Sequence, residues 1–401
     1  MTLPLVVRKS LRHHALSTAI TALSIGLAGA LLMSIWVIKT QSHETFTNFD
    51  GGFDAVVGAR SSKLQLVLNA IFHLEASPAN IEWKDYASLT NHPGVEFAVP
   101  IGMGDNYRGF RIVGTLPDML TRSEYADGKR FRIRPPGRVF DIALREAVVG
   151  SFVAQKLGLK RGDKFHPYHG LNFDEKKKHE EEYVVVGILE PSNTPADRVI
   201  WIPLEGVQKM TGHAVEAAEQ ISAVLVKLRS TSAGQMLDVQ MNRKDTRLTF
   251  AWPIGMVMAD LLSKISWFDR VLALVAYLVA VVAAGSILAS IYNSMNERRR
   301  QIAVLRALGA RRTFVSSSIV LEAIAIAVIG TSIAFVVYAA ITFGAASVIQ
   351  TQTGVVIDPW RFHPVMLWAP LGLIALAALA GLVPAMKAYR VDVAENLAPT
   401  Q

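Results

Sequence analysis

The chain has 401 residues, of which 51% are hydrophobic and 18% are charged, and its formal net charge is +8. Ordinary soluble domains carry about 25% charged residues, so this composition argues against a soluble globular protein and favours a membrane protein. The absence of cysteine excludes disulfides, thiolate metal sites and catalytic thiols. The basic residues form no aromatic-rich platform or groove-reading helix, and we therefore expect no nucleic-acid binding.

Four stretches lack Lys, Arg and Asp and reach the roughly 20 residues needed to cross a bilayer core. They cover residues 15–38, 271–292, 314–349 and 364–384. The third is longer than one crossing requires, and we expect it to continue as a helix beyond the membrane. A cleaved signal peptide is the alternative for the first stretch. We favour a span there because the apolar run is longer than the apolar core of a signal peptide.

Basic residues beside these stretches set the predicted orientation, because Lys and Arg are retained on the cytoplasmic side. They precede the first stretch, follow the fourth, and number six between the second and third. Both termini are therefore predicted to be cytoplasmic. The predicted order is a cytoplasmic N-terminus 1–14, span 15–38, extracytoplasmic domain 39–270, span 271–292, cytoplasmic helix 293–313, span 314–349, outer loop 350–363, span 364–384 and cytoplasmic C-terminus 385–401.

The large segment 39–270 has an α+β pattern. Short runs rich in β-branched and aromatic residues alternate with turn residues and a few helical stretches. The predicted strands are 53–58, 97–101, 110–114, 183–189, 199–202 and 223–228, and the predicted helices are 64–74, 83–90, 151–157 and 204–211.

The most polar part of this segment is the mixed-charge run 174–182. We interpret it as a solvated hairpin loop. The alternative is a divalent metal such as zinc, held by His166, His169 and His179 with neighbouring acids. Because the spacing fits no standard ligand motif, we predict no metal site.

Between the second and third spans, Ile302, Leu305 and Leu308 recur at helical spacing among six arginines. Asn296 can cap the start of a short helix, and Gly309 can end it in the left-handed conformation. The pattern indicates an amphipathic cytoplasmic helix. It is typical both of a docking element for a partner and of a helix resting on anionic lipid.

Several motifs carry a resemblance to a known family. One group of motifs lies in and around the last three spans and comprises residues 297–302 followed by 305–310, the triplet 321–323, and Pro384-Ala385. The other group lies in the large domain and comprises 145–150, 156–163, 184–190 and 200–205. The chain resembles FtsX/MacB-type permease subunits of ABC transporters, the mechanotransmission class that includes lipoprotein-releasing permeases. Gln301 and Val393 depart from the family pattern, where an acidic residue and Pro are usual.

The resemblance implies four transmembrane helices plus an α+β extracytoplasmic domain like the periplasmic core of MacB. It also implies that the cytoplasmic helix couples to an ABC ATPase. The sequence contains no Gly-x-x-x-x-Gly-Lys-Ser/Thr loop, so we expect no cofactor or catalytic residue in this chain, with ATP and Mg bound by a partner ATPase. The expected coupling residues are Glu297, Arg298, Arg299, Ile302, Leu305, Arg306, Leu308 and Gly309.

Glu322 is the one acidic residue within the predicted spans. An ionisable group there needs a partner, water or the interface. We expect it to pair with an arginine of the coupling segment, to cross a dimer interface, or to sit at the interface near the start of its helix. Small residues in the first two spans suit a dimer with a second copy or a paralogue, or packing within one chain.

The function implied is a permease subunit in a bacterial inner membrane. It would drive export or extraction of a periplasmic or outer-leaflet substrate such as a lipoprotein or peptide, with a periplasmic adaptor or substrate-binding protein as a possible further partner. The alternative is an FtsX-like signalling subunit that activates an extracytoplasmic hydrolase without transport. A membrane-bound enzyme is the third interpretation, and no Gly-x-Ser-x-Gly or His-Glu-x-x-His motif supports it.

Overall fold

The computed structural model describes residues 3–126, 128–212, 219–244, 247–297, 309–354 and 356–389. The chain forms two compact units. We call them the helical unit (Met1–Gln41, Ile265–Ala346 and Ile357–Gln401) and the head unit (Ser42–Lys264 and Ser347–Val356).

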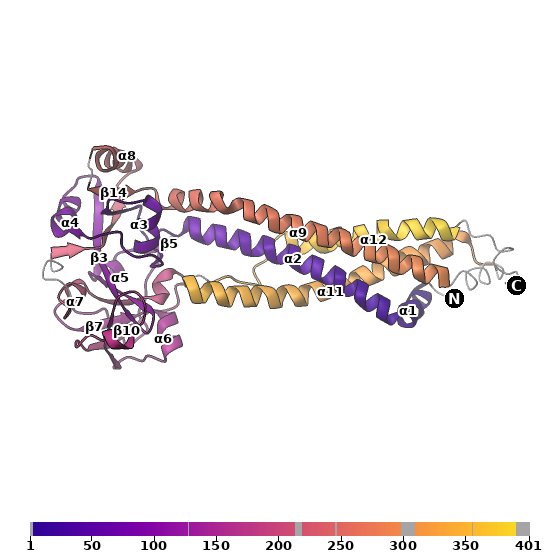
Figure 1. The fold of residues 1–401 in the computed structure, drawn as a ribbon, viewed down its shortest axis with the longest axis horizontal. Coiled ribbons are helices and arrows are strands. Elements are labelled where there is room, and N and C mark those ends of the chain that lie inside the picture. Colours follow the sequence, from indigo (N-terminus) through magenta and orange to yellow (C-terminus); the bar gives the residue numbers. More distant parts are fainter. Residues whose placement is uncertain are drawn as a thin grey trace. The chain divides into compact units, whose positions relative to one another are not determined.

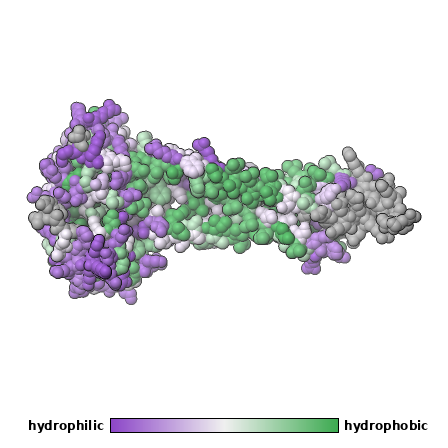
Figure 2. Space-filling model, viewed as in Figure 1, coloured by the Kyte–Doolittle hydropathy of each residue, from purple (hydrophilic) through white to green (hydrophobic). Residues whose placement is uncertain are grey.

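Among the residues that the structure describes, the helical unit contains five helices: α1 (Leu3–His13), α2 (Ala15–Asn48), α9 (Ile254–Glu297), α11 (Arg312–Thr353) and α12 (Val365–Tyr389). The last four are long and apolar enough to cross a membrane. Figure 1 shows them running alongside one another, and Figure 2 shows hydrophobic residues gathered along their visible face. The predicted spans fall within these four helices, apart from Pro364, which directly precedes α12.

Helices α2 and α9 are much longer than the predicted spans, and α11 extends its already long predicted span by a few residues at each end. At 1.5 Å per residue, the 44 residues of α9 extend about 66 Å and the 42 of α11 about 63 Å, against about 30 Å for a bilayer core. No glycine or proline interrupts α2 between Lys39 and Asn48, and it stops just before Gly51 and Gly52, whose φ values are 69° and 89°. Helices α2, α9 and α11 therefore contribute residues to both units.

Glycines let α2 and α11 pack closely inside the helical unit. A Cβ on Gly330 would lie 2.7 Å from Cβ of Ile25, and a Cβ on Gly26 would lie 2.8 Å from Cγ2 of Ile333. The small residues of the first span thus serve packing within one chain, which is one of the two roles expected for them. Gly344, which also lies on α11, has no such neighbour within 4 Å.

The head unit is built on one ten-stranded mixed sheet, with strands in the order β14-β1-β13-β3-β4-β11-β7-β10-β8 and β9 paired to β3. Two small two-stranded sheets, β12 with β2 and β5 with β6, accompany it. The strands are β1 (Ala55–Ala59), β2 (Ile81–Glu82), β3 (Val95–Tyr107), β4 (Phe110–Thr115), β5 (Glu124–Ala126), β6 (Lys129–Arg130), β7 (Glu146–Val149), β8 (Lys164–Phe165), β9 (Tyr168–His169), β10 (Tyr183–Ile188), β11 (Ile200–Pro203), β12 (Gln220–Ile221), β13 (Ala223–Leu228) and β14 (Leu248–Ala251).

Short helices cover the sheet on both faces, because alternate residues of each central strand point to opposite sides. In β1, Val56 packs in a core with α3, whereas Ala55 and Val57 pack in a core with α4 and α8. The described helices are α3 (Lys63–Ala70), α4 (Trp83–Thr90), α5 (Asp118–Thr121), α6 (Ser151–Leu157), α7 (Leu204–Gln208) and α8 (Thr231–Val239), accompanied by the 3-10 helices η1 (Glu175–Lys177) and η2 (Pro195–Arg198) and the π-helix η4 (Gln240–Lys244). The α+β prediction is confirmed.

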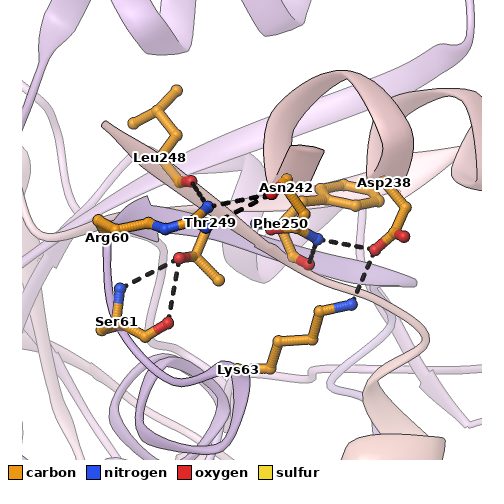
Figure 3. Close-up of polar contacts among 8 residues, drawn as sticks. All are labelled: Arg60, Ser61, Lys63, Asp238, Asn242, Leu248, Thr249 and Phe250. Carbon is orange, nitrogen blue, oxygen red and sulfur yellow. Dashed lines mark hydrogen bonds and ion pairs between the residues drawn. The ribbon is translucent and has the colours of Figure 1, made fainter. Parts of the chain in front are cut away.

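Polar side chains close the outer edge of the sheet at β14. The Asn242 side chain donates to the Phe250 carbonyl (2.8 Å) and accepts from the Phe250 amide (2.9 Å), so it pairs with the strand as a neighbouring strand would. Asp238 accepts from both Asn242 and Lys63 at 2.7 Å (Figure 3). The exposed edge is thereby blocked against pairing with another chain.

We predict that Gly330→Leu lowers the thermal stability of the purified protein, because the new side chain overlaps Ile25 and forces α2 away from α11. Overpacking of this kind typically costs about 1–3 kcal/mol. The measurement is the midpoint of heat-induced aggregation in detergent, followed by size-exclusion chromatography. Gly344→Leu on the same helix is the matched control and should match wild type. Equal midpoints for the two variants would contradict the packing described.

Candidate functional sites

The predicted coupling helix lies almost entirely outside the described residues. Helix α9 ends at Glu297, and Arg298, Arg299, Ile302, Leu305, Arg306 and Leu308 fall in the segment 298–308 that the structure does not describe. The structure resumes at Gly309, whose φ of 97° is the left-handed conformation expected for the residue that ends the helix. The role of these residues in coupling remains a prediction.

Polar contacts connect the described helices near the C-terminal end of α9, where α1 also lies (Figure 1). The Ser10 hydroxyl of α1 donates a hydrogen bond to Oε1 of Glu322 on α11. The Lys387 amino group of α12 donates to the Tyr292 hydroxyl of α9 and lies 4.2 Å from the centre of its ring. Each of the two helices that flank the undescribed segment, α9 and α11, is thus tied to another helix.

The contact explains how the intramembrane carboxyl is accommodated. Glu322 and Ser10 are 9% and 5% exposed, so both polar groups are withdrawn from the surface of the helical unit. Buried carboxyl groups need hydrogen-bond donors, and the Ser10 hydroxyl is one. The structure therefore shows an intrachain partner that was not among the sequence expectations, and no sequence signal marks Ser10 as that partner.

In the head unit, two arginines and a histidine line a pocket of about 220 Å³. Nη1 of Arg111 and Nε of Arg198 are buried and have no hydrogen-bond partner among the residues that the structure describes. Burial lowers the pKa of both arginines. The paired guanidinium groups suit an anionic group such as a carboxylate or phosphate.

His73 is the third polar residue of this pocket. Burial, and then repulsion from the Arg111 guanidinium, lowers the pKa of His73 to about 3. The imidazole is therefore neutral at physiological pH. His73 also has a positive φ of 54°, a conformation that is uncommon outside Gly but that His, like Asn and Asp, adopts more often than other residues.

A larger cleft of about 1340 Å³ lies in the same unit, lined by residues of α4 and α7 among others. Trp83 and Lys84 contribute from α4, Glu205 from α7, and Lys209 directly follows α7. Its lining mixes apolar and charged side chains, which is compatible with contact to a polypeptide.

The three histidines in and before the mixed-charge run, His166, His169 and His179, do not form one cluster. Glu175, Lys176 and Lys177 are exposed, as expected for a solvated loop, but His179 and Glu181 are buried. His166 lies apart, with Nδ1 3.0 Å from the Glu181 carbonyl oxygen. The interpretation of the whole run as solvated is thus wrong for its second half, where alternate side chains turn inward on approach to β10.

Four helices able to cross a membrane, joined to a mixed α/β unit, define a multi-spanning membrane protein with a large domain. Residues 273–393 match the family described as FtsX-like permease C-terminal. The chain is 23% identical over 401 residues to the macrolide export ATP-binding/permease protein MacB of Brucella abortus, and 23% identical over 402 residues to that of Brucella melitensis. The chain therefore contains, at residues 273–393, a region that matches an FtsX-like permease domain, and most of its length is similar to MacB.

These alignments cover 95% and 96% of this chain, and the chain spans 58% of the length of either relative. Among solved structures, the periplasmic region of MacB from Actinobacillus actinomycetemcomitans matches 55% of this chain and 96% of its own, at a TM-score of 0.37 and 10% identity. The extracellular domain of the ABC-type transporter YknZ from Gram-positive bacteria matches 49% of this chain and 98% of its own, at 0.30 and 16%.

We predict that Ser10→Ala lowers the thermal midpoint by a few degrees, because the Glu322 carboxyl loses a donor inside the helical unit. Hydrogen bonds to charged groups contribute about 1.5–3 kcal/mol. Ser332→Ala, on the exposed side of α11, removes only a bond to the Val328 carbonyl of its own helix and serves as the control. A midpoint for Ser10→Ala equal to that of the control would exclude a stabilising contact.

His73 predicts a loss of stability in acid. Its pKa is lowered on folding from 6.5 to about 3, so the unfolded chain binds the additional proton between these pH values. Stability is therefore present above about pH 6.5 and falls by up to about 1.4 kcal/mol per pH unit on acidification below it. His73→Asn, which tolerates the positive φ, should flatten the decrease of thermal midpoint between pH 6.5 and 4. An unchanged slope would contradict this assignment.

Proposed function

We propose that this chain is the permease subunit of an ABC transporter in a bacterial inner membrane. In this proposal a separate ATPase subunit binds ATP and Mg and docks on the segment 293–313, and two permease copies or a copy and a paralogue form the working dimer. ATP hydrolysis then moves the head unit, which exports or extracts a periplasmic or outer-leaflet substrate such as a lipoprotein or peptide.

The match of residues 273–393 to the FtsX-like permease domain carries this proposal. The matched region contains most of α9, all of α11 and α12, and the segment between α9 and α11 in which the coupling residues lie. The Brucella relatives are described as ATP-binding and permease proteins in one chain. We infer that the same two parts, a permease and an ATP-binding part, work together here, with the ATP-binding part supplied by a partner.

Helix continuity supports a mechanical role for the head unit. Helices α2, α9 and α11 each belong partly to the helical unit and partly to the head unit, without a break in the helix. An unbroken ladder of i to i−4 hydrogen bonds resists bending and transmits an axial displacement along its length. A shift imposed at the coupling segment is thereby passed on through α9 and α11, which flank it.

The polar contacts beside the coupling segment support the same mechanism. The Ser10–Glu322 bond joins α1 to α11, and the Lys387–Tyr292 contact joins α9 to α12. Helices that are tied in pairs at the docking end move together. A displacement of α9 therefore also moves α12, and a displacement of α11 also moves α1.

We expect Leu305→Asp combined with Arg306→Glu to abolish retention of the ATPase encoded alongside this chain. The apolar anchor and the positive rim of the docking helix are both reversed by this pair of changes. The measurement is affinity co-purification in mild detergent, followed by the ATPase activity of the recovered complex. Wild type should retain an active ATPase, and the loss in the variant should exceed about tenfold.

Leu305→Met with Arg306→Lys is the matched control, since it keeps apolar bulk and charge at the same two positions. Both variants must show the wild-type profile in size-exclusion chromatography. Failure of the wild type to retain any ATPase, with the protein folded, would overturn the transporter proposal. In that case the FtsX-like signalling alternative would be tested by pull-down of an extracytoplasmic hydrolase with the same protein.

A further inference from the structure

The fold brings Asp105, His169 and His179 together at one end of the long strand β3. Asp105 on β3 is the direct antiparallel partner of His169 on β9. Tyr168, the residue before His169, forms a β-bridge with Lys178, the residue before His179. Residues from three separate parts of the sequence therefore meet through backbone pairing, and that pairing fixes their spacing.

The distances between their ligand atoms suit a metal ion. Oδ1 of Asp105 lies 3.2 Å from Nε2 of His179 and 3.5 Å from Nδ1 of His169, and one ligand atom from each residue lies within 4.8 Å of the others. Ligands bound to tetrahedral zinc at about 2.0–2.1 Å are about 3.3 Å from one another. The two distances from Asp105 are thus close to the edge of such a tetrahedron, and the two histidine nitrogens lie within 4.8 Å of each other.

The hydrogen bonds of His179 orient its ring for this role. Nδ1 of His179 lies 2.8 Å from the carbonyl oxygen of Thr211, which assigns the proton of a neutral ring to Nδ1. When the ring is neutral, the lone pair of Nε2 faces Oδ1 of Asp105 at 3.2 Å and is available to a metal ion, whereas in a protonated ring the same contact is an ion pair.

A second layer of contacts holds these groups in place. Oε1 of Glu181 accepts hydrogen bonds from the backbone amide (2.8 Å) and the hydroxyl (2.6 Å) of Thr211, whose carbonyl orients His179. The side-chain amide of Asn106 donates to the carbonyls of Gly170 (2.8 Å) and Tyr168 (3.3 Å), on either side of His169. Support of this kind for ligating histidines is a regular feature of metal sites.

Burial gives the cluster one accessible side. The side chains of Asp105 and His179 are 0% and 4% exposed, whereas that of His169 is 50% exposed. An ion can therefore enter past His169, and a bound ion would keep a fourth coordination position open to water or to an exogenous ligand. Two imidazoles and one carboxylate favour zinc and similar first-row ions over calcium or magnesium, which prefer oxygen ligands throughout.

We propose that Asp105, His169 and His179 form a binding site for a divalent first-row transition metal, with zinc as the ion to test. The site would join β3 to the loop between β8 and β10, and a bound ion would fix that part of the head unit. This inference is independent of the transport assignment, because it concerns only residues of the head.

The experiment is a titration of the full-length protein in detergent, stripped with a chelator and with its affinity tag removed. Zinc is added in competition with a chromogenic chelator. We expect one zinc per chain with a Kd below about 1 µM, and a loss of affinity of at least about 100-fold in His169→Ala, since loss of a direct ligand exceeds the effect of losing outer contacts. His169 is half exposed, so this variant should fold.

His166→Ala is the matched control, because His166 lies three residues away on the same loop and outside the cluster. It should bind zinc as wild type does. X-ray absorption of the zinc-loaded protein should show nitrogen and oxygen ligands at about 2.0 Å, together with scattering from imidazole rings. The signal from these ligands should be weaker in Asp105→Asn and in His179→Ala. Absence of tight binding by wild type, or equal affinities for the His169 and His166 variants, would overturn the proposal and leave the cluster as an internal ion pair.

Discussion

The absence of water from the bilayer core is the constraint on which the rest of the molecule depends. A crossing segment must satisfy all of its backbone hydrogen bonds internally, and a helix does so with its own chain. In α2, α9 and α11 the helix continues past the length needed for the crossing. The secondary structure required in the membrane is thus carried without interruption into the head unit.

Much of the fold could be predicted because it depends on local pattern. Long apolar stretches without Lys, Arg or Asp marked the four long helices, and runs rich in β-branched residues marked the central strands, including β4, β11 and β13. The continuation of α2 to Asn48 was not predicted, since hydropathy falls there while nothing breaks the helix. The two-residue strand β9 was also missed, because so short a strand is defined by its pairing with β3 and has no periodicity of its own.

The candidate sites were less predictable because they depend on long-range pairing. Glu322 was identified from sequence, since an acidic residue in an apolar helix is rare, but its partner Ser10 lies 312 positions away and has no distinguishing pattern. Likewise His169 and His179 stood out in a charged loop, whereas Asp105 lies beyond the predicted end of its strand at residue 101. Only the register of β3 against β9 brings the carboxylate to the histidines.

The C-terminal end of α11, from Ser347 onward, belongs to the head unit, and this has a practical consequence for isolating that domain. The Arg198 guanidinium donates to the Gln352 carbonyl, and Gln352 forms part of the wall of the arginine pocket. A soluble fragment made of residues 42–264 alone would leave Arg198 without this acceptor and the pocket open on one side. The head is discontinuous in sequence, so a faithful fragment must also contain residues 347–356, joined by a linker or supplied as a peptide.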